Sequence, residues 1–175
     1  MGFQATLNQT RIIMKEIEIT VGGIPASELL KMLRHKGACA ISTEEQENYL
    51  FSRFETLPEP RKLRLAIISG QELGVPEVDG FVSYRDVFDA AINKFQFGHC
   101  PPETAAHFCL QHELEKGRDL EFGMEWLTCK SGRVRIFRVN NYHDDESQSL
   151  NSSGYNNGPE TKTKSSTLWV FVLQP

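Results

Sequence analysis

Alternating hydrophobic and polar residues mark the first predicted strand, over residues 15–21. Ile17, Ile19 and Val21 alternate there with polar residues, which is the pattern of a strand with one face in water. Residues 63–68 and 167–173 are instead apolar at nearly every position and rich in branched side chains. Both runs predict strands, and we expect the second, apolar on both faces, to lie inside a sheet rather than at its edge.

Apolar residues at helical spacing predict three helices. Residues 27–36 carry Leu29 and Leu33, one turn apart, on one side. Residues 42–54 begin with serine and have glutamate three positions later, which is the pattern of a capping box. Residues 83–95 repeat apolar side chains every three or four positions and form the third predicted helix.

The second half of the chain returns to strand-like alternation. Residues 106–114 alternate over their whole length, which predicts a strand, with a helix as the competing interpretation. A glycine-containing turn leads to a second strand over residues 120–126, and a turn near residue 131 leads to a third over residues 133–141. These elements predict an antiparallel hairpin.

The hairpin has a preferred register. A loop over residues 130–133 places Trp126 opposite Phe137 and Glu125 opposite Arg138. Aromatic and oppositely charged cross-strand pairs each contribute about 0.2–1 kcal/mol, so this register is chemically consistent. We further expect Trp126 to be buried on the sheet face that carries Phe122.

Residues 144–166 are rich in Ser, Asn, Gly and Thr and contain little that can be buried. The composition predicts a long polar loop, with residues 146–166 as a mobile insertion between two strands. Leu150 and Tyr155 are its only large apolar residues. They are therefore the expected anchors for a partner protein.

Together these elements predict one α+β domain over residues 1–175. In this prediction, one or more N-terminal strands and about three helices pack on a C-terminal antiparallel sheet of four strands. A length of 175 residues suits a single domain. Residues 1–13 precede the first strand, and we expect a disordered arm or an extension foreign to the native chain.

Composition and charge narrow the class of protein. The chain is 39% hydrophobic and has a formal net charge of −4, which disfavours nucleic acid as a partner. No apolar run approaches the roughly 18 residues that a membrane span needs. The four cysteines follow a start without a signal-peptide apolar region, so we expect reduced thiols in the cytoplasm. No feature of the sequence indicates an oligomeric state.

The segment 99–112 contains the candidate metal ligands His107, Cys109 and His112. Imidazole and thiolate are the ligands that zinc prefers. The spacing is unfavourable, because His112 points away from the other two on a strand, and the two histidines diverge by about 140° on a helix. The preferred interpretation is a structural segment with no cofactor, and zinc is the alternative.

Cys100 is the candidate nucleophile, with the adjacent His99 as its base. A reactive thiol needs a lowered pKa, and neighbouring side chains on an extended backbone usually point apart. The sequence contains no phosphate-binding loop, H-E-x-x-H or G-x-S-x-G motif. We therefore expect a non-enzymatic binding or regulatory module that acts through a protein partner. The alternative is a small metal- or cysteine-dependent hydrolase that uses residues 99–112.

Overall fold

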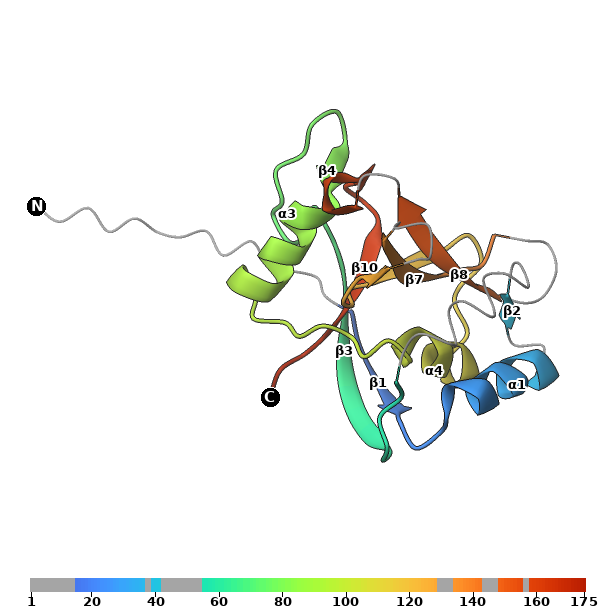
Figure 1. Ribbon diagram of the computed structural model, residues 1–175. Coiled ribbons are helices and arrows are strands. Elements are labelled where there is room, and N and C mark those ends of the chain that lie inside the picture. The colour runs from blue at the N-terminus through green and yellow to red at the C-terminus, as the bar shows by residue number, and fades with distance from the viewer. Residues whose placement is uncertain (1–14, 37–38, 42–54, 129–133, 143–147, 156–157) are drawn as a thin grey trace, which may run out of the picture.

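The computed structural model describes residues 15–36, 39–41, 55–128, 134–142, 148–155 and 158–175 (Figure 1). The predicted arm over residues 1–13 and the predicted helix over residues 42–54 lie outside the described residues. None of the helices in the described part of the chain is long and apolar enough to cross a membrane.

Among the described residues, eight strands form one mixed sheet (Figure 1). Seven lie in the order β1 (Lys15–Val21), β3 (Arg61–Ser69), β10 (Leu168–Val172), β5 (Asp119–Phe122), β7 (Val134–Asn140), β8 (Gln148–Tyr155) and β2 (Cys39–Ile41). The eighth, β6 (Leu127–Thr128), pairs with β7. The β10–β5 and β2–β8 pairs are parallel and the other pairs are antiparallel. A separate two-stranded sheet joins β4 (Phe81–Ser83) to β9 (Lys162–Lys164).

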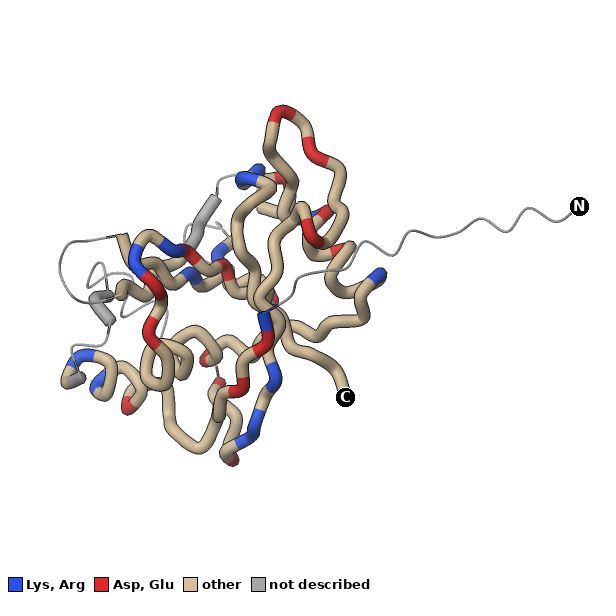
Figure 2. The backbone as a smooth tube through the Cα atoms, turned by 180° about the vertical axis from the view of Figure 1, so that it is seen from behind, with Lys and Arg blue, Asp and Glu red and all other residues tan. Residues whose placement is uncertain are grey.

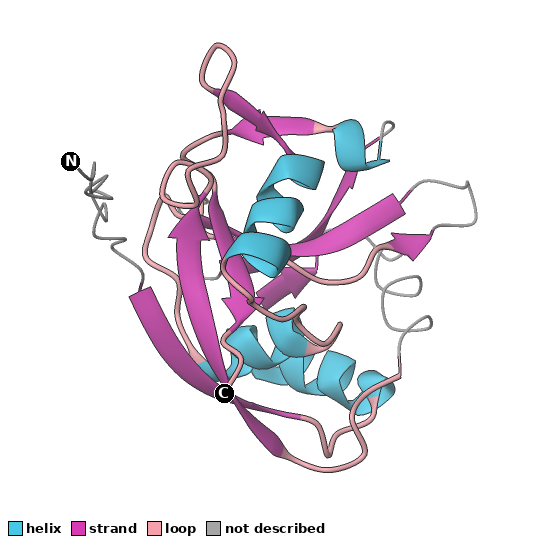
Figure 3. Ribbon diagram, turned by 90° about the vertical axis from the view of Figure 1, so that its left-hand side faces the viewer, coloured by secondary structure: helices cyan, strands magenta, loops and turns pink. Residues whose placement is uncertain are grey.

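The described helices lie on opposite faces of the large sheet (Figures 1 and 3). They are α1 (Ala26–Lys36), α3 (Tyr84–Asp89) with its π-helical continuation η1 (Ala90–Lys94), α4 (Thr104–Gln111) and the 3-10 turn η2 (Gly158–Glu160). Phe108 of α4 packs edge-on against Phe122 of β5, with ring centres 5.8 Å apart. Phe88 of α3 packs on Trp169 and Phe171 of β10, each at 5.7 Å. We call the two sides the α4 face and the α3 face.

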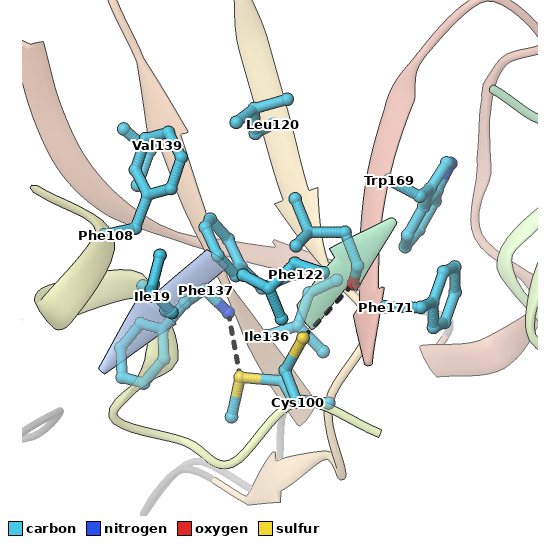
Figure 4. Close-up of a cluster of buried hydrophobic side chains, with 14 of the residues drawn as sticks. Ile19, Cys100, Phe108, Leu120, Phe122, Ile136, Phe137, Val139, Trp169 and Phe171 are labelled. Atoms are coloured by element: carbon cyan, nitrogen blue, oxygen red, sulfur yellow. Dashed lines mark hydrogen bonds between the residues drawn. The ribbon is translucent and has the colours of Figure 1, made fainter. Parts of the chain in front are cut away.

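The strand β10 contributes buried side chains to the core on both faces of the sheet. Val170 points to the α4 face, whereas Trp169 and Phe171 point to the α3 face, and all three are fully buried. Figure 4 shows Trp169 and Phe171 on one side of the strand and Phe108 and Phe122 on the other. The prediction of an internal strand here is confirmed. The predicted strands at 15–21 and 63–68 are also confirmed, as β1 and β3, and so is the helix at 27–36, as α1.

The predicted strand over residues 106–114 is wrong, because Thr104–Gln111 forms α4. Six consecutive residues from Thr104 to Cys109 are buried, so this short helix is covered on nearly all sides. A helix with so little exposed surface has no amphipathic period to reveal it. The chain becomes extended only at His112.

The predicted hairpin register is also wrong, by four residues. Arg138 lies opposite Glu121 instead of Glu125, and β5 ends at Phe122. The chain leaves the ladder with β7 at Gly123, and this glycine lies so close to Phe171 that a Cβ would collide with the ring. Pairing with β7 resumes only in β6.

Trp126 is placed differently from the prediction. It is half-buried on the α3 face, whereas Phe122 is buried on the α4 face. The indole stacks on Tyr84 at 5.8 Å and on Phe88 at 5.6 Å. The segment that leaves the ladder after Gly123 carries Trp126 to the opposite side of the sheet.

The predicted polar loop over residues 144–166 is wrong, because β8 pairs with β7 from Gln148 to Tyr155. A strand is held by backbone hydrogen bonds, which polar side chains do not prevent. Buried Gln148 also bonds to the backbone of the segment after α4, accepting from the Leu114 N–H at 2.9 Å. The four-stranded antiparallel sheet of the prediction is accordingly too small, since the N-terminal strands join the same mixed sheet.

Candidate functional site

The outer edge of β1 is the end of the large sheet, and α4 covers part of it. Alternate residues of an antiparallel edge strand turn both N–H and C=O away from the sheet. The amide of Gln111 fills this position at Thr20: its Nε2 donates to the Thr20 C=O at 2.6 Å and its Oε1 accepts the Thr20 N–H at 2.9 Å. One side chain of the helix thus makes the two hydrogen bonds that a neighbouring strand would make.

Two histidines of the α4 segment extend this coverage on either side. His107 Nε2 accepts the N–H of Gly22 at 3.3 Å, and His112 Nε2 donates to the C=O of Glu18 at 3.2 Å. The buried His107 ring can accept only when Nε2 carries no proton. Burial lowers the pKa of His107 and so favours this neutral form.

The residue before α4 fixes the helix against the chain that enters β3. The fully buried carboxylate of Glu103 accepts the N–H of Leu57 at 3.0 and 3.1 Å. Burial raises the pKa of Glu103, and the hydrogen bond from Leu57 opposes that rise. The Leu57 carbonyl in turn accepts the N–H of Gly23 at 2.9 Å. This end of α4 is therefore held by the backbone of Leu57, which is itself bonded to Gly23.

Coverage of the β1 edge stops at Glu18. The helix ends at Gln111, and the chain then runs through residues 113–118 toward β5. Alternation places the N–H of Glu18 and both backbone groups of Glu16 on the outer edge, and no described residue hydrogen-bonds to them. The half of the edge formed by Lys15–Glu18 is open, whereas Thr20 and Gly22 form the closed half.

A cavity of about 380 Å³ adjoins the open half on the α4 face. Its apolar floor comes from four strands, and the end of α4 forms a wall. We call it the β1 pocket, lined by Lys15, Ile17, Ile67, Glu72, Phe108, His112, Glu113, Leu114, Glu115, Arg118, Leu120 and Leu168. Its volume lies within the range of ligand sites, and it combines an apolar floor with a rim of charged side chains and His112.

The charged side chains at the rim of the β1 pocket differ in whether they already have a hydrogen-bond or ion-pair partner. Glu72 accepts hydrogen bonds from the Ser69 N–H and hydroxyl at 2.7 and 2.8 Å. Arg118 makes a long, exposed contact of 3.4 Å with Glu115. Lys15 has no hydrogen-bond or ion-pair partner within the described part of the chain. Among the described residues that line the β1 pocket, Lys15 is therefore the available cation beside the open half.

The α3 side of the same strand is electrically balanced. Basic and acidic positions are interspersed along the backbone (Figure 2). Arg64 contacts Glu16 at 2.7 Å and Lys62 contacts Glu18 at 2.9 Å, across β1 and β3. These exposed pairs add little stability, but they leave no net charge on that side of β1.

The structure does not pair Cys100 with His99. The Cys100 thiol is buried and donates to the Val170 carbonyl at 3.3 Å (Figure 4), and burial raises its pKa far above the ordinary value. His99 is exposed and packs against Phe88, with ring centres 5.7 Å apart. This environment stabilises the protonated thiol, which is the less nucleophilic form.

The three candidate zinc ligands of the alternative interpretation are not brought together either. His107 and His112 bond to the β1 edge, and Cys109 is buried in the core. Across the residues that the structure describes, no group of three or more His, Cys, Asp or Glu side chains is placed to hold a metal ion. The histidines are instead hydrogen-bond partners of a strand.

The predicted partner anchors lie elsewhere than expected. Leu150 is 1% exposed and sits in the core opposite Val139, so its prediction as a surface anchor is wrong. The Tyr155 backbone pairs with Val134, and its side chain lies outside the described part.

Sequence reasoning missed Gln111 and Lys15. A helix prediction over 104–111 would have placed His107 and Gln111 on one side, four residues apart.

Comparison of the chain with protein-family models, with curated proteins and with solved structures finds no match.

Proposed function

We propose that this protein is a non-enzymatic binding module that acts through a protein partner, and that an extended segment of the partner adds as a strand to the open half of the β1 edge. One observation supports this most: the hydrogen bonds from the α4 segment end at the Glu18 carbonyl, beside the β1 pocket. In strand addition, main-chain hydrogen bonds provide affinity and adjoining pockets provide specificity. The open half offers both features together.

The expected affinity is modest. The N–H and C=O of Glu16 and the N–H of Glu18 can make three hydrogen bonds, worth about 0.5–1.5 kcal/mol each. Association and the ordering of a flexible segment offset most of that gain. Contacts in the β1 pocket must therefore supply a large part of the net affinity, as in transient regulatory interactions.

We also propose a cytoplasmic location. Cys100 and Cys109 are both buried, and the Cys100 thiol is free, which fits a reducing compartment. Both pack as small hydrophobic side chains within the core.

A substitution at Glu16 tests the proposed strand addition. Glu16→Pro removes an outward N–H and leaves the ladder with β3 intact, since proline is tolerated where an edge N–H faces water. Glu16→Ala is the matched control, because both variants lose the carboxylate that contacts Arg64. The probe is the acetylated and amidated heptapeptide TTVTTTT, titrated to millimolar concentration into ¹⁵N-labelled protein.

We expect the peptide to shift the amide signals of residues 15–18 in the wild type and in Glu16→Ala, and to shift them far less in Glu16→Pro. Equal binding by the proline and alanine variants would refute strand addition at this edge. So would the absence of any peptide-dependent shift at residues 15–18 in the wild type.

A further inference from the structure

We infer that the partner segment carries an apolar residue followed two positions later by Asp or Glu, with the apolar side chain in the β1 pocket and the carboxylate at Lys15. This inference rests on the proposed function and specifies the class of peptide. It follows from the direction of the added strand, the composition of the pocket and the charges around it.

The order of the two residues follows from antiparallel pairing, which is slightly more stable per residue than parallel pairing. A peptide residue opposite Glu16 can exchange both hydrogen bonds with it. The preceding peptide residue then lies opposite Ile17 and the following one opposite Lys15. Because side chains alternate, these two face the β1 pocket and the middle one faces the α3 side.

The position opposite Ile17 suits an apolar side chain. Ile17 lies at the border of the pocket floor, which continues through Ile67 and Leu168 to Leu120. Phe108 forms part of the wall on the α4 side. A valine, leucine or isoleucine of the peptide would remove apolar surface from water on both itself and this floor.

The position opposite Lys15 suits a carboxylate. Lys15 has no partner among the described residues, whereas Glu16 and Glu18 on the other side are matched by Arg64 and Lys62. Arg118 lies on the same rim but already contacts Glu115 at 3.4 Å, so Lys15 is the basic group among the described lining residues that can pair with the peptide. An opposite-charge cross-strand pair corresponds to a roughly 1.5- to fivefold gain in affinity.

Glu113 is the group that limits this preference. Glu113 also lines the β1 pocket, and no described residue forms an ion pair with it. It would repel an acidic peptide without lying in the cross-strand position itself. Neutralising Glu113 should therefore strengthen the preference for an acidic residue, whereas changing Lys15 should remove it.

The test compares four acetylated and amidated heptapeptides: TTVTETT, TTVTTTT, TTVTKTT and the reversed order TTETVTT. Each is titrated at low salt into the wild type, Lys15→Met, Lys15→Glu and Glu113→Gln, and affinities are taken from the amide shifts of residues 15–18. We expect TTVTETT to bind the wild type about 1.5- to fivefold more tightly than TTVTTTT, and more tightly than TTETVTT. Lys15→Met should equalise TTVTETT and TTVTTTT, Lys15→Glu should favour TTVTKTT, and Glu113→Gln should increase the advantage of TTVTETT.

Equal affinities for all four peptides, with shifts at residues 15–18, would overturn this inference and leave strand addition standing. Tighter binding of TTETVTT would overturn the antiparallel order. Failure of every peptide to shift these signals would refute the proposed function and the inference together. Concentration-dependent shifts at residues 15–18 without peptide, accompanied by dimerisation, would identify a second copy of the chain as the occupant and overturn the inference.

Discussion

The closed and open halves of the β1 edge belong to one strand with one pairing partner, yet they differ in exposure to other chains. Thr20 and Gly22 bond to side chains of α4, whereas Glu16 has no such partner among the described residues. The cause is the length of α4, which ends at Gln111. An unpaired edge is a template for another strand, and proteins usually protect it. Here a helix protects part of the edge, and the end of that helix determines where a partner can bind.

The largest expected loss of stability comes from removing the buried hydrogen bond between Gly22 and His107 in the closed half. His107→Ala removes a buried ring and leaves the Gly22 N–H without its acceptor. The cavity and the unpaired donor together should lower the free energy of unfolding by about 2–4 kcal/mol. Urea denaturation measures this, with His107→Gln as a control that keeps an acceptor nearby and should lose less. A loss below about 0.5 kcal/mol for the alanine variant would show that this bond does not hold the edge.

A smaller effect is expected at the exposed end of the closed half. Gln111→Ala removes both hydrogen bonds to Thr20, and because they are exposed to water the loss should be only about 1 kcal/mol. The Thr20 amide should then exchange with solvent much faster than in the wild type. Unchanged exchange at Thr20 would mean that another group closes this part of the edge.

The stability of the closed half should also depend on pH. Because burial lowers the pKa of His107 below its ordinary value of 6.5, the unfolded chain binds a proton there at a higher pH than the folded chain. The contribution of His107 is therefore fully present above pH 6.5 and decreases as the pH falls toward the lowered pKa. The measurement is the unfolding free energy of wild type minus that of His107→Gln between pH 7.5 and about 5.

The buried carboxyl of Glu103 has the opposite dependence, since its pKa is raised above 4.5 and its contribution weakens as the pH rises. It is present in both proteins, so it cancels in the difference. A difference that stays constant with pH would contradict the role of the neutral His107 ring.

The strands that position the site could be predicted from sequence where local pattern and environment agree. Ile17, Ile19 and Val21 face the core and alternate with exposed glutamates, so β1 was predicted with its observed bounds. The internal position of β10 followed from residues that are apolar on both faces. In these segments, burial on one face or on both leaves its own periodicity in the sequence.

The remaining elements depend on contacts between distant parts of the chain. α4 is buried by both α1 and the sheet, which hides its helical period, and the polar strand β8 is held by pairing with β7. The roles of His107, Gln111 and His112 require contacts with residues 85 to 94 positions away. Sequence reasoning therefore singles out two of these residues, as candidate zinc ligands in the alternative interpretation, but it does not place them at the edge of β1. Only the packing of α4 beside β1 shows that they close an edge.

Amide hydrogen exchange along β1, measured by NMR with and without the peptide TTVTETT, tests the central claim most directly. In the free protein we expect protection at Ile17 and Ile19, which face β3, and at Thr20 and Gly22, which bond to α4, with rapid exchange at Glu16 and Glu18. Addition of the peptide to saturation should slow exchange at Glu16 and Glu18 and leave Thr20 and Gly22 unchanged. If Glu16 and Glu18 are already as protected as Thr20 in the free protein, or stay unprotected when the peptide is bound, then the open half of the β1 edge does not accept a strand.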